Sequence, residues 1–196
     1  NKTIPVIGVS GKGIQVKADS QYVSLPCPAY GPQFEYDFWY NPGSAVAGVD
    51  LSILGGVALG SNGDKGGVAF SMYGGNNRLY FDIYSSTMRY ALNFNGFSLL
   101  QGTHFWTLQY DGNTLKVYRD AILIASNTIG AVTIDITGSP TLFLGSTTAK
   151  YTNGTGWMDE VMRFEKAHTE SEIRGLYLAK SLPKQYTLTD WQMEQM

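Results

Sequence analysis

Hydrophobic and polar side chains alternate along several short stretches of the chain, and this period of two residues predicts β-strands. In the stretch 34–40 every second residue is aromatic, so one face of that strand is expected to enter a core. Glu35, Asp37 and Trp39 fall on the opposite face. The middle of the chain repeats short apolar runs between glycine-rich turns, which favours an all-β protein.

A β-hairpin is predicted at 106–118. Trp106, Leu108 and Tyr110 alternate onto one face and are followed by an Asp-Gly dipeptide, which supplies the positive φ that tight hairpin turns need. The next turn contains Asp120-Ala121. A type I′ turn would force Ala121 to positive φ, so we expect a longer or differently typed turn there.

One helix is predicted near the C-terminus. Thr169 can cap its first turn, and Glu172 completes a capping box. Its apolar residues form one stripe of Ile173, Leu176 and Tyr177. Pro183 ends the helix. We therefore expect one domain over residues 1–184 and a tail at 185–196 that packs on the domain or on a neighbour.

Four features follow one another between His104 and Tyr177. They are the Trp106 strand with its Asp-Gly turn, Leu142-Phe-Leu-Gly145, Trp157-Met-Asp-Glu-Val161 and the capped helix. This series resembles the C-terminal half of laminin-G-like domains, which are concanavalin A-like lectin jelly rolls. The resemblance implies an all-β, two-sheet antiparallel β-sandwich with one short C-terminal helix.

Composition narrows the range of partners. Charged residues make up 15% of the 196 residues and the net charge is −2, so the clustered lysines and arginines of a nucleic-acid-binding protein are not expected. The sequence has no apolar run long enough for membrane insertion. A single cysteine, Cys27, excludes an intrachain disulfide and a CxxC metal site. The low charge favours an extracellular or virion-surface domain. The first residue is Asn1 rather than Met, so we expect a processed or excised chain.

Candidate catalytic groups are few. Laminarinase-type glucanases share this type of fold and carry two carboxylates and then a third in the pattern E-x-D-x-x-E, which supplies a closely spaced nucleophile and acid. Here Glu35 and Asp37 begin that pattern, but Tyr40 stands where the third carboxylate should be. The two histidines, His104 and His168, lack the signatures of a nucleophilic triad and are interpreted as turn residues. We predict that the domain is not an enzyme.

Asp159 is the candidate metal ligand. It matches the aspartate of the D-E-V strand, which the resemblance implies can anchor a structural calcium ion together with backbone carbonyls of the N-terminal region. Calcium accepts many carbonyl and water oxygens, so one carboxylate can serve as the anchor. Strand alternation would place Asp159 on the same face as Arg163, so an ion pair between them is the alternative, as are bonds to backbone amides.

A glycan site would combine aromatic platforms with amide, hydroxyl or guanidinium donors. The candidates come from the Tyr- and Asn-rich middle of the chain and one later loop. They are Tyr73, Asn76, Asn77, Arg78, Tyr80, Tyr84, Arg89, Tyr90, Asn93, Asn95 and Tyr151. Tyrosine is also a good β-former, so each ring has an alternative interpretation as a sheet or core residue.

Two functions remain open. The first is a non-catalytic, lectin-like carbohydrate-binding module of an extracellular or phage surface protein. The second is a structural virion component, such as a capsid-decoration or head- or tail-fibre domain, which binds protein partners in a larger assembly and has no glycan ligand of its own.

Overall fold

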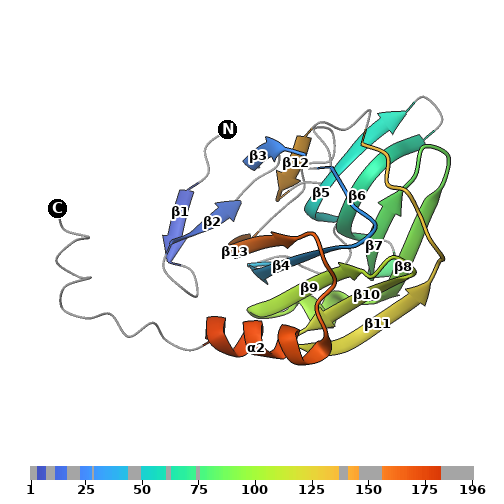
Figure 1. Cartoon of the computed structure of the whole chain (residues 1–196). Helices are drawn as coiled ribbons and strands as arrows, with labels where there is room; N and C mark the ends of the chain where they lie inside the picture. Colours follow the sequence, from blue (N-terminus) through green and yellow to red (C-terminus); the bar gives the residue numbers. More distant parts are fainter. Residues whose placement is uncertain are drawn as a thin grey trace.

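The computed structural model is a sandwich of two antiparallel β-sheets with a helix on one outer side (Figure 1). It describes residues 4–7, 12–16, 23–27, 29–43, 50–60, 63–73, 76–136, 141–145 and 156–181. The predicted fold class, an all-β two-sheet sandwich with a short C-terminal helix, is confirmed. The predicted tail, 185–196, and Tyr151 lie outside the described residues.

The first sheet has seven strands, and its order brings a late strand between two early ones. The order is β1 (Ile4–Ile7), β2 (Lys12–Val16), β13 (Gly156–Phe164), β4 (Phe34–Asn41), β9 (His104–Tyr110), β10 (Thr114–Arg119) and β11 (Ile122–Thr128). The predicted hairpin is the pair β9 and β10, in which Leu115 lies opposite Tyr110.

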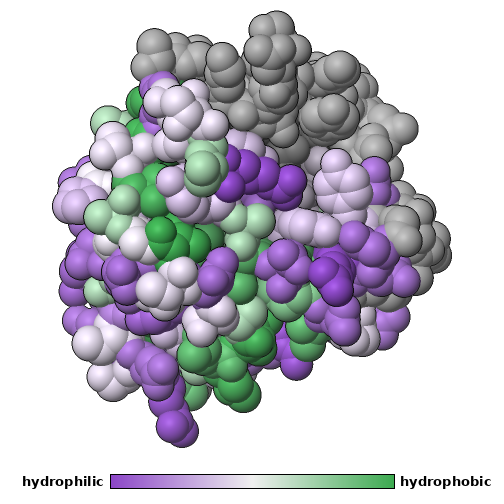
Figure 2. Space-filling view, turned by 90° about the vertical axis from the view of Figure 1, so that its right-hand side faces the viewer, coloured by the Kyte–Doolittle hydropathy of each residue, from purple (hydrophilic) through white to green (hydrophobic). Residues whose placement is uncertain are grey.

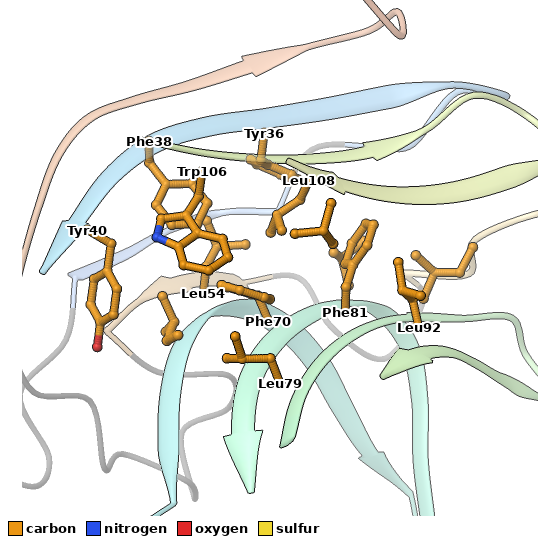
Figure 3. Packing of buried hydrophobic residues seen from close by; sticks show 14 of the residues in the cluster. Tyr36, Phe38, Tyr40, Leu54, Phe70, Leu79, Phe81, Leu92, Trp106 and Leu108 are labelled. Atoms are coloured by element: carbon orange, nitrogen blue, oxygen red, sulfur yellow. The ribbon is translucent and has the colours of Figure 1, made fainter. Parts of the chain in front are cut away.

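The second sheet has six strands. Their order is β3 (Val23–Pro26), β12 (Thr141–Leu144), β5 (Leu51–Gly60), β6 (Gly63–Tyr73), β7 (Arg78–Tyr84) and β8 (Arg89–Asn95). Figure 3 shows strands of this sheet arching toward the core, so that their ends bend away from the other sheet. The outer face of the six-stranded sheet is therefore concave.

The core lies between the sheets and is mainly aromatic (Figure 3). The alternate residues of β4 that were expected to face inward do so: Phe34 and Phe38 are fully buried. Phe38 contacts Phe70 of the opposite sheet, with ring centroids 6.3 Å apart, and Phe70 in turn packs on Trp106 at 5.3 Å. Each fully buried side chain of this size stabilises the fold by about 1.5–3 kcal/mol.

Two helices lie in the described part of the chain, α1 (Phe97–Leu100) and α2 (Glu170–Ser181). The predicted capping box of α2 is confirmed: the Thr169 amide donates to Glu172 at 2.7 Å, and the Glu172 amide donates to the Thr169 hydroxyl at 3.3 Å. Ile173 is fully buried, and Tyr177 packs its ring against Trp39. Helix α2 thus covers the outer face of the seven-stranded sheet. No helix in the described ranges is long and apolar enough to cross a membrane.

The turn between β10 and β11 differs from the expectation. Arg119 pairs with Ile122, so the loop has only two residues, and both have positive φ: 53° at Asp120 and 61° at Ala121. The prediction of a longer or differently typed turn is therefore wrong. Hydrogen bonds hold the tight turn in place, because the Asp120 amide donates to the carbonyl of Phe105 at 2.8 Å and its carboxylate accepts from the Phe105 amide at 3.0 Å.

The alternation expected for β13 is also interrupted. Asp159 lies opposite Trp39 and Met162 lies opposite Asp37, so two residues of β13 face one residue of β4 in a β-bulge. The bulged residue Glu160 has a φ of 50°. Beyond the bulge the faces are exchanged, and Arg163 lies on the side of the sheet opposite to Asp159.

Candidate functional site

Polar and aromatic side chains gather on the concave outer face of the six-stranded sheet. Leu79, Phe81 and Ile83 of β7 enter the core, so the residues between them point outward. The strand registers place their neighbours beside them: Tyr73 lies opposite Arg78, and Tyr80 lies opposite Asn93. We call this group the tyrosine–arginine patch. It consists of Tyr73, Asn76, Arg78, Tyr80, Arg89 and Asn93.

Two tyrosine rings form the apolar part of the patch. The rings of Tyr73 and Tyr80 meet edge to face, with centroids 5.5 Å apart and an interplanar angle of 68°. Tyr73 is 53% exposed, a large fraction for a ring of this size. The Tyr80 hydroxyl accepts a hydrogen bond from the Asn76 amide at 2.9 Å, which fixes the ring from its outer end. The patch therefore offers an exposed aromatic surface on a rigid strand pair.

Arg89 is tied to the sheet below it. Its guanidinium donates to Asp82 at 2.8 Å and lies over the ring of Tyr80, 5.4 Å from the centroid. Asp82 is buried, with 2% of its surface exposed. Burial alone lowers the pKa of Arg89, but the hydrogen bond and charge of Asp82 outweigh it and raise that pKa above its ordinary value. Arg89 is thus a charged side chain whose position at the border of the patch is fixed by Asp82 and Tyr80.

Arg78 is held more loosely. Its side chain is exposed, and its Nη1 donates to the amide oxygen of Asn93 at 3.0 Å. Its backbone amide donates to Asn76 at 3.1 Å, which closes the turn between β6 and β7. Arg78 therefore sits beside the tyrosine rings with a neutral partner.

The remaining predicted ligand residues are distributed differently. Tyr84 shares the outward face of β7 but is only 4% exposed and packs with Ala69, so it presents no surface to a ligand. Tyr90 packs against the core instead. Asn77 is exposed in the turn before β7, with a φ of 53°. Asp82 was not among the predicted ligand residues. The alternation of β7 places it on the same face as Tyr80, next to strand β8, which carries Arg89.

The carboxylates of β4 are buried on the other side of the molecule, beneath α2. Glu35 and Asp37 are both 0% exposed. Glu35 accepts from the ring of His168 at 2.6 Å and from Gln109 at 2.6 Å, while Asp37 accepts from the Thr107 hydroxyl at 2.6 Å. Burial, reinforced by the charge of Glu35, raises the pKa of Asp37 to about 8. In this arrangement Glu35 joins the segment before α2 to the sheet, Asp37 bonds to the neighbouring strand β9, and neither carboxylate is exposed.

The other histidine has a structural partner as well. His104 contacts Asp120 through Nδ1 at 2.6 Å and the carbonyl of Gln101 through Nε2 at 2.7 Å. Both histidines were expected at turns, and each in fact joins a turn to a neighbouring carboxylate. Neither lies in the tyrosine–arginine patch.

Asp159 is 8% exposed, and its Oδ1 accepts from the amide of Glu160 at 2.9 Å. The expected alternative, an ion pair with Arg163, is not formed, because the bulge turns Arg163 toward Tyr30, Glu165 and the carbonyl of Ala29. Among the described residues no group of three Asp, Glu, His or Cys side chains could hold a metal ion. A calcium ion at Asp159 would need backbone carbonyls and waters for its other ligands. It stays a proposal, which a calcium-dependent shift in Tm would support.

A hollow of about 360 Å³ lies where loops at one end of the sandwich meet. It is lined by Tyr30, Gly31, Pro32, Tyr110, Gly112, Ala131, Val132 and Thr133. The Tyr110 hydroxyl is already used, because it donates to the carbonyl of Gly130 and accepts from the amide of Val132. No charged side chain lines this hollow, so it offers less for recognition than the patch does.

A side view of the molecule shows how apolar and polar surface is divided. On the face drawn in Figure 2, apolar side chains (green) gather near the centre and lower down, and polar side chains (purple) border both areas. The exposed large hydrophobic residues of the described chain are spread over different elements. They are Leu25, Tyr73, Met88, Ile122, Leu123 and Leu178.

Comparison with known families shows to which family the chain belongs. Residues 17–174 match the laminin-G family model described as the concanavalin A-like lectin/glucanases superfamily. The chain belongs to this family. The resemblance inferred from the C-terminal half is thereby confirmed, and the laminin-G-like match begins far upstream of it. None of the curated proteins matches the sequence.

Solved structures share the laminin-G-like sandwich at low sequence identity. The CBM40 module of a Ruminococcus gnavus IT-sialidase, bound to α2,3-sialyllactose, has a TM-score of 0.66 and 14% identity over 84% of this chain and 96% of its own. Domain 4 of an extracellular GH43 arabinanase from Geobacillus stearothermophilus, in complex with arabinotriose, has a TM-score of 0.67 and 18% identity over 90% and 82%.

The botulinum neurotoxin serotype D binding domain has a TM-score of 0.64 and 12% identity over 87% of this chain. The chain spans 43% of that domain's length, less than half. At these identities the likeness shows a common fold, so the ligand of this chain has to be argued from its own residues.

Proposed function

We propose that this domain is a non-catalytic glycan-binding module, and that the tyrosine–arginine patch is its binding surface. The observation that carries the proposal is the exposed ring of Tyr73 beside Tyr80, with Arg78 and Asn93 next to them on the same concave face. The proposal is supported by two solved sandwich structures of the same fold, one bound to sialyllactose and one in complex with arabinotriose.

The chemistry of the patch suits a sugar ring. An aromatic ring covers the apolar face of a pyranose, and amides and guanidinium groups donate to its hydroxyls. Tyr73 supplies an exposed ring at the edge of the patch. Arg78 supplies donors on the neighbouring strand β7, directly opposite Tyr73, and Asn93 supplies them one strand further, on β8 opposite Tyr80. The position of these groups on paired strands preorganises them, which reduces the entropy lost on binding.

The same patch lacks what hydrolysis needs. A retaining glycosidase uses two carboxyl groups about 5 Å apart, one as nucleophile and one as acid. Among the described residues of this face, Asp82 is buried and paired with Arg89. The other carboxylate pair, Glu35 and Asp37, is buried under α2. This distribution supports binding without catalysis.

A glycan array tests the proposal, followed by affinity measurements on the best binder. We expect Tyr73→Ala to weaken binding about tenfold, because removal of an aromatic contact with the sugar costs about 1–2 kcal/mol. Leu178→Ala is a matched control, since it truncates an exposed apolar side chain on α2. Absence of binding across neutral and acidic glycans would refute the function, and equal affinities for both variants and wild type would refute the site.

A further inference from the structure

We infer that the glycan recognised by the tyrosine–arginine patch carries an anionic group, a carboxylate or a sulfate, and that Arg78 binds this group. The inference rests on the proposed function and names the ligand class of the same site. It follows from the way in which the charges of the patch are partnered.

The charge of Arg89 is already compensated. Asp82 accepts from its guanidinium at 2.8 Å, and Asp82 is buried, so the ion pair is shielded from water on one side. The guanidinium is also held over the ring of Tyr80. An incoming anion would have to displace Asp82 or share Arg89 with it. Arg89 therefore acts as a structural support for Tyr80.

The charge of Arg78 is not compensated within the patch. Its side-chain hydrogen bond goes to the carbonyl oxygen of Asn93, which is a neutral acceptor. That bond uses one N–H of Nη1, and among the described residues no further acceptor binds this guanidinium. Since Arg78 is exposed, its remaining N–H groups are open to a ligand. Asn93 orients the guanidinium without neutralising it.

The position of Arg78 brings this charge next to the sugar platform. Arg78 lies directly opposite Tyr73 in the pairing of β6 and β7, and Tyr80 is two residues further along the same face of β7. Side chains at such positions are about 5–7 Å apart. A ring seated on Tyr73 would therefore bring its substituents within reach of Arg78.

A free guanidinium at this place favours an anion over a hydroxyl. Arginine binds carboxylate and sulfate-like groups through two parallel hydrogen bonds, and such charge-assisted bonds are about twice as strong as neutral ones. We expect an acidic glycan to bind at least about tenfold more tightly than its neutral counterpart at low salt. Rising ionic strength should reduce that difference.

Matched pairs of probes test the inference with the whole chain. The pairs are trigalacturonic acid and its methyl ester, 3′-sialyllactose and lactose, and 3′-sulfolactose and lactose. They are printed on one array with a broad set of acidic and neutral glycans, and the dissociation constants of the pairs that bind are measured by calorimetry. The first pair isolates a carboxylate, the second adds a whole sialic acid residue that carries one, and the third isolates a sulfate.

The variants separate charge from geometry. Arg78→Gln should abolish the preference for the acidic member, so that both members of a pair bind with similar affinities, and Arg78→Lys should restore part of the preference. Arg174→Gln, which removes the same charge from an exposed position on α2, should change nothing. Melting temperatures check that the variants fold.

Each outcome decides between the two proposals. Preference for acidic glycans that disappears in Arg78→Gln supports the inference. Equal binding of acidic and neutral members, or a preference that survives Arg78→Gln, overturns the inference and leaves the glycan-binding function standing. Absence of binding to every glycan overturns both.

Discussion

Ala121 occupies the left-handed region, with a φ of 61°, in the two-residue turn between β10 and β11. An L-residue pays about 1–2 kcal/mol for this conformation, whereas glycine adopts it freely. The turn persists because the Asp120 amide donates to the carbonyl of Phe105, while the Asp120 carboxylate accepts from the Phe105 amide and contacts His104. We predict that Ala121→Gly raises the free energy of unfolding by about 0.5–1 kcal/mol.

Urea denaturation of the purified domain measures this change. Ala125→Gly is the matched control, because Ala125 lies within β11 and is not among the described residues with positive φ. Glycine in a strand interior destabilises, so the two substitutions should shift the unfolding midpoint in opposite directions. A loss of stability in Ala121→Gly would show that the alanine methyl group makes a contact worth more than the backbone strain.

The residues of the candidate site illustrate what a sequence pattern can and cannot predict. A period of two places Arg78, Tyr80, Asp82 and Tyr84 on one face of β7, and the structure agrees. It does not say which of these four are accessible. Tyr84 and Asp82 are buried on that same face, because burial depends on how the rest of the chain packs over the sheet.

At the scale of elements, helix α2 and strand β4 are joined by a buried polar cluster. His168, directly before the helix cap, donates from its backbone amide to Glu35 at 3.1 Å and contacts the same carboxylate through its ring. Asp37 lies two residues along β4, and its Oδ2 has no hydrogen-bond partner among the described residues. The segment before α2 is thus bound to Glu35, which is well bonded, while Asp37 has one bonded and one unbonded oxygen.

Because of Asp37, the free energy of unfolding should depend on pH. Its pKa is raised to about 8 in the folded protein, above the value of about 4 for an unfolded aspartate. The folded state therefore binds this proton more strongly than the unfolded state does between these two values. Stability contributed by Asp37 is present below about pH 4 and is lost as the pH rises toward 8. We predict that the free energy of unfolding falls by at least about 1 kcal/mol between pH 5 and pH 8.

The variant Asp37→Asn isolates this effect. It keeps the shape and the acceptor for Thr107 but cannot ionise, so its unfolding free energy should change less between pH 5 and pH 8 than that of the wild type. Glu165→Gln is the control, because this carboxylate is 81% exposed at its side chain and should leave the slope unchanged. Parallel pH profiles for wild type and Asp37→Asn would show that Asp37 is ionised in the folded state.

Element prediction succeeded where the pattern is local and failed where it depends on pairing. The alternation of β4 and the capping box of α2 are encoded within each segment, and both were predicted. The bulge in β13 arises from its register against β4, which no window of the β13 sequence contains. For that reason Arg163 was predicted on the same face as Asp159, whereas it lies on the opposite face.

At the scale of the whole molecule, the two outer faces of the sandwich differ. Helix α2 covers the seven-stranded sheet and buries Glu35, Asp37 and Trp39. The concave face of the six-stranded sheet leaves Tyr73 and Arg78 exposed. The glycan-binding site that we propose is therefore placed on the concave face, from the residues exposed there and not from the fold.

An assembly role would instead need a contact surface, and the edge strand β11 offers the clearest start of one. Ile122 is 67% exposed and Leu123 is 42% exposed at the beginning of this strand, which ends the seven-stranded sheet. Unpaired edges with apolar residues are templates for contact with another chain. However, a stable interface buries about 1,200 Å² or more in total, and two side chains supply a small part of that.

We therefore predict that the isolated chain is a monomer at micromolar concentration, because two exposed side chains at the edge of the described sheet are too few for a stable interface between copies. Light scattering after size-exclusion chromatography measures the mass at several concentrations. The variants are Ile122→Lys, which places a charge on the edge, and a deletion of residues 185–196. If the wild type forms a defined oligomer that either change disperses, the domain assembles through that element, and the structural role in a larger particle becomes the better account of its function.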